Sequence, residues 1–290
     1  MTTLQKIVVG VEETLGSYGV PAPKREALLM LSTLLGIKPG AVFFKDGSLL
    51  NARAEVELNQ WLKRRKKREP LNYITGECDF WSLTFMVTPK VLIPRPETEQ
   101  LVEETLLAVK DKKTPLILDL CTGSGCVGIS IASELKDSRL VATDLSSDAL
   151  AIAKANAEKN KVSSQIDYLE GNLFEALDKR NLALSFDVIT SNPPYINSAD
   201  IDGLAPEVSV FEPRISLDGG TDGLILIRKI INDAPKFLKP GGTLLMEFGF
   251  GQAKDILNIV EECKAFEEVE TLKDLSGIER VLRVKKKIKD

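Results

Sequence analysis

The strongest chemical signal in the chain is the tetrapeptide Asn192-Pro193-Pro194-Tyr195, which follows an apolar run from Phe186 to Ser191. Each proline fixes its own φ and favours extended geometry in the residue before it, so the segment forms a stiff loop. Neither proline has an N–H, so the exposed polar atoms are mostly carbonyl oxygens, and the Asn192 amide adds another acceptor. Two acceptors suit the two hydrogens of a planar NH2 group, against which Tyr195 packs a flat face. A bare Asn-Pro-Pro is more often an ordinary turn, so this interpretation requires a cofactor site upstream.

A strand, a glycine turn and a helix lie upstream, in the order of a nucleotide-type pocket. The apolar run from Leu116 to Leu120 predicts a buried strand, and the segment from Val127 to Leu135 predicts a helix. Between them, Gly123 and Gly125 let the backbone approach a ligand, and the helix offers its first N–H groups. With Gly128 the spacing also fits a dinucleotide fold, whereas the Gly-Lys-Ser/Thr ending of a phosphate-binding loop is missing.

An acidic residue, Asp144, ends the second predicted strand, which runs from Leu140 to Thr143. It follows the glycines by about 20 residues, where an acid holds ribose hydroxyls in nucleotide-binding folds. Asp144 could also cap the helix predicted from Ser146 to Asn160, and the two roles are compatible. Position and residue type together favour the ligand role.

A third predicted strand, from Gln165 to Leu169, ends shortly before Asn172. The Asn172 amide could read an adenine edge beside the apolar Leu173 and Phe174. Because parallel strands end at one edge of a sheet, this residue is expected near the glycine turn and Asp144. The tetrapeptide therefore has a cofactor site beside it.

These motifs carry a family resemblance. Their order resembles that of class I methyltransferases, which use S-adenosylmethionine and act on planar nitrogen. Further blocks resemble the protein-glutamine N5-methyltransferases of peptide chain release factors, the PrmC/HemK family. The blocks are Val91 to Glu99, Ser191 to Ile196, Phe211 to Arg214 and Asp218 to Leu224. The similarity runs from about residue 70 to the end, whereas the earlier residues match only in length and helical character.

The resemblance implies an activity, a fold and a partner. The activity is methyl transfer from S-adenosylmethionine to the glutamine side-chain nitrogen of the Gly-Gly-Gln motif in class I release factors, leaving S-adenosylhomocysteine. The fold is α/β, with a seven-stranded doubly wound methyltransferase domain over residues 96–290. A β-hairpin linker over residues 71–95 would join it to a small helical domain, residues 1–70, that recognises the release factor. We expect a monomer that binds neither DNA nor membranes.

The resemblance also assigns site residues. Asn192, Pro193 and Tyr195 are expected to be catalytic, and with Pro194 they would contact the substrate. Arg95 and Glu97 would border the substrate cleft, although the charge of Glu97 also suits a helix start. The residues expected to bind the cofactor are Asp119, Thr122, Gly123, Ser124, Gly125, Asp144, Leu145, Asn172, Leu173 and Asn192.

The expected mechanism relies on positioning, because a glutamine amide nitrogen is a poor nucleophile whose lone pair is delocalised into the carbonyl. We expect the Asn192 side-chain oxygen and the Pro193 carbonyl to accept the two amide hydrogens and stabilise developing charge. No strong base is needed before attack, since the methyl donor is already activated.

One residue departs from the family pattern: Cys121 stands where the family usually has glycine. Cysteine is small and the two later glycines remain, so the change is expected to be tolerated. If the position requires a positive φ, the substitution costs on the order of 1 to 2 kcal/mol.

The chain contains no histidine among its 290 residues. This excludes a Ser-His-Asp triad, an imidazole base and a His-ligated zinc. The four cysteines have no metal-ligand spacing, so we expect no metal and no disulfide. Methyl transfer from S-adenosylmethionine remains compatible with this composition, because the methyl donor is already activated.

Length and charge suit one large and one small domain. A hydrophobic fraction of 43% is normal for a globular protein, and the start of the chain resembles no cleavable signal, so we expect a cytoplasmic location. Residues 1–80 carry 12 Lys and Arg against 9 Asp and Glu, whereas the remainder carries 26 against 33. The first part is therefore net positive and the rest net negative.

Helical patterns fill the amino-terminal part. Leu4, Ile7, Val8 and Val11 share one helical face, and two further helices are expected at residues 26–35 and 52–65. The third helix ends in a basic run from Lys63 to Arg68, which we interpret as a solvated face rather than a site for RNA or an acidic partner.

The rest of the chain predicts further sheet elements. A short hairpin is expected at residues 77–88, and Pro96 suits the first turn of a helix that begins near Arg95. Helices at 224–238 and 252–263, a strand at 243–248 entered through a glycine turn, and a hairpin at 266–284 would complete the sheet.

Two other functions remain open on the residues alone. A DNA adenine-N6 methyltransferase also uses Asn-Pro-Pro-Tyr, because adenine presents a conjugated NH2 group. Net negative charge and the lack of a DNA-recognition insert argue against it. A noncatalytic RNA-associated module would use the helical domain and the basic run. The intact acid, glycines and tetrapeptide argue against that alternative.

Overall fold

The computed structural model of the protein describes residues 4–178, 180 and 182–288, within which the chain divides into two compact units. The helical unit consists of Met1–Glu77 and Ala205–Phe211, and the sheet unit consists of Cys78–Leu204 and Glu212–Asp290. A short segment from the second half of the chain thus belongs to the helical unit. The sequence patterns did not predict this exchange.

In the described residues, a seven-stranded sheet forms the centre of the sheet unit, in the order β5-β4-β3-β6-β7-β9-β8. The strands from β5 to β7 run parallel, whereas β9 pairs antiparallel with both β7 and β8. The strands are β3 (Leu116–Leu120), β4 (Arg139–Asp144), β5 (Ile166–Glu170), β6 (Phe186–Ser191), β7 (Leu238–Glu247), β8 (Phe266–Lys273) and β9 (Glu279–Lys286). The predicted doubly wound sheet is confirmed.

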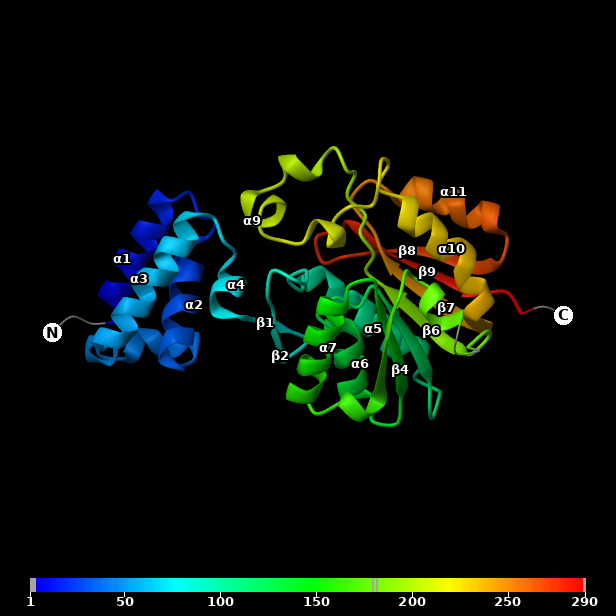
Figure 1. The fold of residues 1–290 in the computed structure, drawn as a ribbon, viewed down its shortest axis with the longest axis horizontal. Coiled ribbons are helices and arrows are strands. Elements are labelled where there is room, and N and C mark those ends of the chain that lie inside the picture. The colour runs from blue at the N-terminus through cyan, green and yellow to red at the C-terminus, as the bar shows by residue number, and fades with distance from the viewer. Residues whose placement is uncertain (1–3, 179, 181, 289–290) are drawn as a thin grey trace. The chain divides into compact units, whose positions relative to one another are not determined.

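Helices cover both faces of this sheet (Figure 1). They are α5 (Glu99–Ala108), α6 (Cys126–Glu134), α7 (Ser147–Lys159), α8 (Glu175–Asp178), α10 (Ile225–Phe237) and α11 (Ala253–Cys263). Neighbouring strand residues face opposite sides, so Leu118 packs with α10 and α11 while Ile117 packs with α5 and α6. The parallel strands are buried on both faces of the sheet, which explains why their sequences are continuous apolar runs.

One strand differs from its prediction. Strand β7 begins at Leu238 rather than at Thr243, because Leu238 already pairs with Phe186. The register then shifts before Thr243 pairs with Val188, and Gly241 lies in this irregular stretch with φ 73°. The glycine pair therefore interrupts the strand instead of preceding it.

The predicted hairpin is confirmed as the pair β1 (Glu77–Phe80) and β2 (Leu83–Met86). Its tight turn places Trp81 and Ser82 at positive φ, 49° and 59°. A short helix, α4 (Leu71–Thr75), precedes it and ends at Gly76 with φ 79°. The stretch expected as a linker therefore begins as helix.

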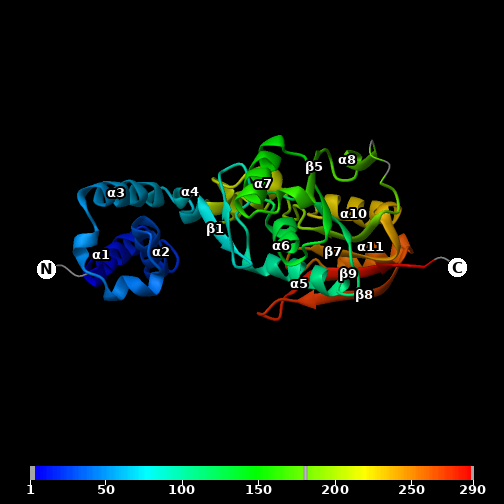
Figure 2. The ribbon, with the colours of Figure 1, turned by 90° about the horizontal axis from the view of Figure 1, so that it is seen from below.

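The helical unit contains α1 (Leu4–Ser17), α2 (Pro23–Leu35), α3 (Ala52–Lys66), α4 and α9 (Pro206–Ser209). The first three pack together, as Figure 2 shows for the amino-terminal part of the chain. Leu4, Val8 and Val11 are buried as predicted, and Gly36 ends α2 with φ 62°. The three predicted helices are confirmed.

The interpretation of the basic run as a solvated face is wrong for Arg65 and Arg68. Arg65 is only 1% exposed, and its guanidinium pairs with Glu26 at 2.7 Å and with Glu207 at 3.1 Å. Arg68 also pairs with Glu207, at 2.7 Å. A buried arginine needs such partners, because an unpaired charge in the interior is strongly destabilising. These ion pairs attach α9 to α3.

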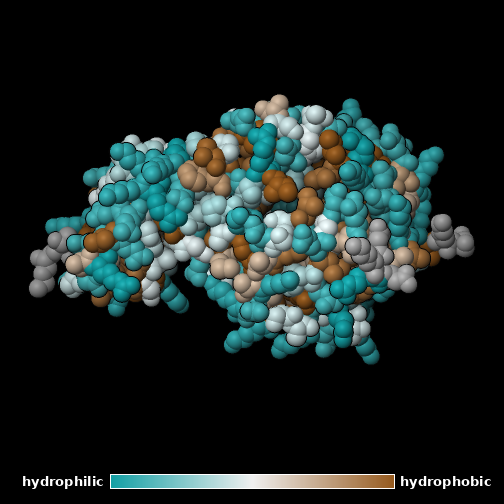
Figure 3. All heavy atoms as spheres, in the orientation of Figure 1, coloured by the Kyte–Doolittle hydropathy of each residue, from teal (hydrophilic) through white to brown (hydrophobic). Residues whose placement is uncertain are grey.

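Hydrophilic side chains cover most of the face drawn in Figure 3. Some large apolar side chains stay exposed, among them Phe44, Phe250 and Leu275. Among the described residues, no helix combines the length and the apolar character that crossing a membrane requires.

Candidate active site

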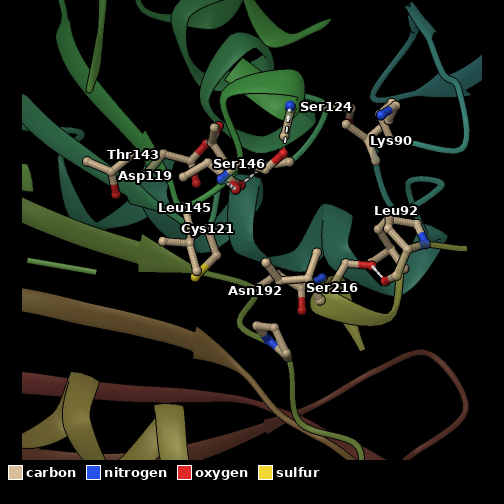
Figure 4. Close-up of a pocket in the computed structure, with 18 of the residues that line it drawn as sticks. Lys90, Leu92, Asp119, Cys121, Ser124, Thr143, Leu145, Ser146, Asn192 and Ser216 are labelled. Carbon is tan, nitrogen blue, oxygen red and sulfur yellow. Dashed lines mark hydrogen bonds between the residues drawn. The ribbon is translucent and has the colours of Figure 1, made fainter. Parts of the chain in front are cut away.

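A cavity lies in the sheet unit where β3, β4 and β6 end (Figure 4). The strand-end residues gather on one side of it, and Lys90 and Leu92 lie on the other. Except for Gly125, every residue predicted to bind the cofactor lines it: Asp119, Thr122, Gly123, Ser124, Asp144, Leu145, Asn172, Leu173 and Asn192. The topology has brought together motifs from four separate stretches of sequence.

The glycine turn shapes one wall of the cavity. Gly123 has φ 56°, and a Cβ added there would meet no atom within 4 Å. Gly125 has φ 81°, and its Cβ would lie 2.7 Å from Ile129 Cδ1, inside the packing of α6. Gly123 therefore leaves space for a ligand beside the backbone, whereas Gly125 allows the turn to pack.

Asp119 lies beneath this turn and is 2% exposed. Its Oδ2 accepts a hydrogen bond from the Thr122 hydroxyl at 2.6 Å and one from the Gly128 N–H at 3.1 Å. Burial raises the pKa of Asp119 to about 7, although both hydrogen bonds act in the opposite direction. A cation in the cavity would stabilise its ionised form.

Asp144 joins the glycine turn to the next helix. Its Oδ2 accepts from the Gly123 N–H and its Oδ1 from the Ser146 N–H, both at 2.9 Å. Ser146 itself caps α7 by accepting from the Ala149 N–H. Asp144 is therefore not the helix cap, and its remaining lone pairs can accept ribose hydroxyls.

The loop after β5 divides between cavity and core. Asn172 and Leu173 line the cavity, as predicted. Phe174 is 5% exposed and stacks on Phe237 with ring centroids 4.8 Å apart, so it packs in the core instead. The expectation that Phe174 would flank the adenine is wrong, because its ring points to the other side of the loop.

Cys121 adopts a positive φ of 59°, so the residue that replaces the usual glycine occupies a left-handed position. Its side chain borders the cavity, and burial raises the pKa of its thiol well above the usual range. The thiol is thus neutral and does not act as a nucleophile at ordinary pH.

The Asn-Pro-Pro-Tyr segment follows β6 at the same edge of the sheet. Asn192 and Pro194 line the cavity, whereas Pro193 and Tyr195 lie outside its lining. The Tyr195 hydroxyl donates a hydrogen bond to Glu247 Oε1 at 3.2 Å, and the Asn192 Nδ2 group donates to Thr98 Oγ1 at 3.1 Å. The catalytic and substrate roles assigned to this segment stay predictions.

The sequence motifs did not single out Glu247, and they assigned no role to Thr98, although it lies in the Val91 to Glu99 block. Glu247 is 2% exposed, and its Oε2 accepts from the Thr98 hydroxyl at 2.7 Å. Burial raises the pKa of Glu247 to about 7, against the effects of Thr98, Tyr195 and Arg280. The sequence did contain one signal for Glu247: it is an acidic residue directly after the apolar run from Leu244 to Met246.

Arg95 and Glu97 lie at the start of η3 (Pro96–Thr98), which leads into α5. Arg95 pairs with the buried Glu212 at 2.5 Å, and this ion pair fixes the position of its guanidinium group. Glu97 is exposed, and its charge helps to raise the pKa of Glu247. Neither residue lines the cavity, and their substrate-binding roles stay predictions.

Two further segments of the lining overlap the family-resemblance blocks that begin at Val91 and at Phe211. Lys90 to Leu92 follow the hairpin, and Lys90 Nζ pairs with Asp148 at 2.7 Å. Pro213 and Ser216 come from the loop between Tyr195 and α10. Within the described residues, no group of three His, Cys, Asp or Glu side chains is placed to hold a metal ion.

The cavity lies at the carboxyl edge of a doubly wound sheet, where such folds bind their ligands. The architecture is that of a class I methyltransferase. A structural neighbour, the hMettl16 catalytic domain solved in complex with MAT2A 3'UTR hairpin 6, has a TM-score of 0.57 and 16% identity over 83% of this chain and 84% of its own. This likeness concerns the fold alone.

Sequence comparison defines the family more narrowly. The family model "PrmC N-terminal domain" matches residues 8–76, and "Methyltransferase small domain" matches residues 98–208. The release factor glutamine methyltransferase of Geobacter sulfurreducens is 39% identical over 97% of this chain and 95% of its own length. That of Caulobacter vibrioides is 36% identical over the same shares. The chain therefore belongs to the release factor glutamine methyltransferase family, and the resemblance noted in its motifs is confirmed.

Proposed function

We propose that this protein transfers a methyl group from S-adenosylmethionine to the side-chain amide nitrogen of the Gly-Gly-Gln glutamine in class I release factors. The observation that carries the proposal is the Asn192 amide, which borders the cavity and directs its Nδ2 group toward Thr98. Its oxygen remains available as an acceptor beside a pocket lined by the cofactor motifs. Membership of the family supports the choice of glutamine.

The cavity residues fit S-adenosylmethionine. Gly123 leaves open space beside its backbone, and Asp144 can accept the ribose hydroxyls. The buried Asp119 carboxylate has no cationic partner among the described residues, so the positive charges of the cofactor would stabilise it. Asn172 and Leu173 offer an amide and an apolar surface to the adenine.

When bound, the cofactor supplies an electrophilic methyl group that needs no further activation. The task of the protein is to align the acceptor, because the lone pair of a glutamine amide is delocalised into its carbonyl. Asn192 Oδ1 and the Pro193 carbonyl oxygen accept the two amide hydrogens and turn the nitrogen lone pair toward the methyl carbon. The Tyr195 ring packs against the amide plane.

These acceptors also stabilise the charge that develops on nitrogen as its bond to the methyl carbon forms. The methylated nitrogen becomes strongly acidic and then loses one of its two protons to solvent. No base is required before attack, which agrees with a chain that has no histidine.

The partner is the release factor itself, which the helical unit would help to recognise. A monomeric state and a cytoplasmic location, where release factors act, stay predictions.

The test incubates the protein with S-adenosylmethionine labelled in the methyl group and with a class I release factor. Parallel samples contain the same factor with alanine in place of the Gly-Gly-Gln glutamine, or duplex DNA. We expect label on the unaltered factor and none on the other two. Label on DNA alone, or equal label on both factors, would refute the proposal.

A further inference from the structure

A chain of hydrogen bonds behind the Asn-Pro-Pro-Tyr segment links three distant parts of the sheet unit. Asn192 Nδ2 donates to Thr98 Oγ1 at 3.1 Å, and the Thr98 hydroxyl donates to Glu247 Oε2 at 2.7 Å. The other oxygen of the carboxylate, Oε1, accepts from the Tyr195 hydroxyl at 3.2 Å. One buried acid thus holds both polar side chains of the segment.

The sheet brings these groups together. Ser191 pairs with Met246 in the parallel ladder of β6 and β7, so the next residues, Asn192 after β6 and Glu247 at the end of β7, lie side by side. Thr98 reaches them from η3 and is 2% exposed. All of this lies behind the cavity, because Asn192 lines it while Thr98 and Glu247 do not.

The direction of the chain follows from what each group can do. An ionised carboxylate only accepts hydrogen bonds, so the Thr98 hydroxyl must give its single proton to Glu247. The oxygen of that hydroxyl can then only accept, and the Asn192 group that it accepts from must be the NH2 end. Among the described residues no donor contacts Asn192 Oδ1, so the oxygen end is the one left for the substrate.

We infer that Glu247 and Thr98 are positioning residues that set the orientation of the Asn192 amide and thereby present its oxygen to the acceptor NH2 group. The inference rests on the proposed function, because the orientation matters only where Asn192 receives a hydrogen from the substrate. Without this restraint, the Asn192 amide would turn its NH2 end toward the substrate in part of the molecules. Two hydrogen-bond donors, the Asn192 NH2 and the substrate NH2, would then face each other. The carboxylate removes that alternative.

Thr98→Val tests the inference, because valine keeps the shape of the side chain without its hydroxyl. We expect its kcat for release factor methylation at pH 8 to fall on the order of 10- to 100-fold, as for a small misplacement of a reacting group. The KM values for the release factor and for S-adenosylmethionine should change by less than about threefold, since Thr98 does not line the cavity. Thr98→Ser restores the hydroxyl and should recover most of the lost kcat.

Thr105→Val is the matched control. Thr105 is also buried, lies in α5 just after η3, and donates only to its own helix, to the Leu101 carbonyl at 2.7 Å. Thr105→Val measures the general effect of deleting a buried hydroxyl from this part of the fold. The kcat of this variant should equal that of the unaltered protein. Melting curves identify a variant that fails to fold, in which case Thr98→Ala replaces Thr98→Val.

The outcomes separate the two proposals. Absence of label on the release factor with the unaltered protein refutes the proposed function, whatever the variants do. Normal labelling by the unaltered protein together with equal kcat for Thr98→Val and Thr105→Val refutes the positioning role. Equal losses in Thr98→Val and Thr98→Ser also refute it, because shape rather than the hydroxyl would then matter.

Discussion

Two buried carboxylates, Asp119 and Glu247, lie at the carboxyl ends of β3 and β7 and differ in what they hold. Each is 2% exposed, and burial raises the pKa of each to about 7. Asp119 accepts from Thr122 and from a backbone N–H in the first turns after its own strand. Glu247 accepts from Thr98 and Tyr195, side chains that come from two other parts of the chain.

The difference shows how two halves of one site are built. The region around Asp119 is local: the carboxylate and the turn that it holds lie within nine positions of each other in sequence. The region around Glu247 is assembled from residues up to 149 positions apart. We therefore expect changes near Asp119 to act on cofactor binding and changes near Glu247 to act on turnover.

The largest expected effect is that of Asn192→Ala. The proposed role of Asn192 as an acceptor that stabilises developing charge predicts that this change lowers kcat by about 100- to 1000-fold. The dissociation constant of S-adenosylmethionine is measured in parallel by titration calorimetry, because Asn192 also lines the cofactor cavity. A near-normal rate with normal cofactor binding would remove the acceptor role of Asn192.

The second prediction concerns pH and stability. The pKa of Glu247 in the folded protein, about 7, lies above the ordinary glutamate value of 4.5, so the folded protein binds this proton more tightly than the unfolded chain. The resulting stability is fully present below about pH 4 and is lost as the pH rises through 7. Between pH 5 and pH 8 the loss from Glu247 is on the order of 2 to 3 kcal/mol.

Urea unfolding of Glu247→Gln measures this pH dependence of stability. The free energy of unfolding of the variant, relative to the unaltered protein, should rise between pH 5 and pH 8, because the amide cannot ionise. Glu103→Gln, at an exposed position of α5, is the control and should follow the unaltered protein. A constant difference between Glu247→Gln and the unaltered protein would contradict the prediction.

A smaller effect is expected from Asp119→Asn. The new amide oxygen can still accept from Thr122 and Gly128, so the glycine turn keeps its hydrogen bonds while the negative charge is lost. The dissociation constant of S-adenosylmethionine should rise about tenfold, as for the loss of a partly buried charge interaction. At saturating cofactor, kcat should stay within about threefold. A fall in kcat with unchanged affinity would show that the two regions are not separate.

The smallest effect is expected at Cys121, whose φ is 59°. Cys121→Gly removes the left-handed strain, and Cys121→Ala retains it without the thiol. The glycine variant should be more stable than the alanine variant by about 1 kcal/mol, which thermal unfolding can measure. Equal stabilities would mean that the position carries no backbone strain.

Much of this architecture could be predicted because its signals are local. Apolar runs predicted β3 and β4, and the chain order placed Asp144 and Asn172 at the same sheet edge. The burial of Arg65 in the basic run could not be predicted from local signals. Its ion-pair partners are Glu26 and Glu207, and Glu207 comes from a distant segment of the chain. Local composition contains no information about such partners.

Sequence alone determined the order of strands and helices, the glycine turn and the acceptor segment, since each depends on the conformational preferences of a few consecutive residues. Only the tertiary structure decided that Phe174 faces the core and that Glu247 lies beside Asn192. The physical reason is strand register: the pairing of β6 with β7 depends on the packing of the whole sheet, and shifting it by one residue would turn Glu247 to the other face.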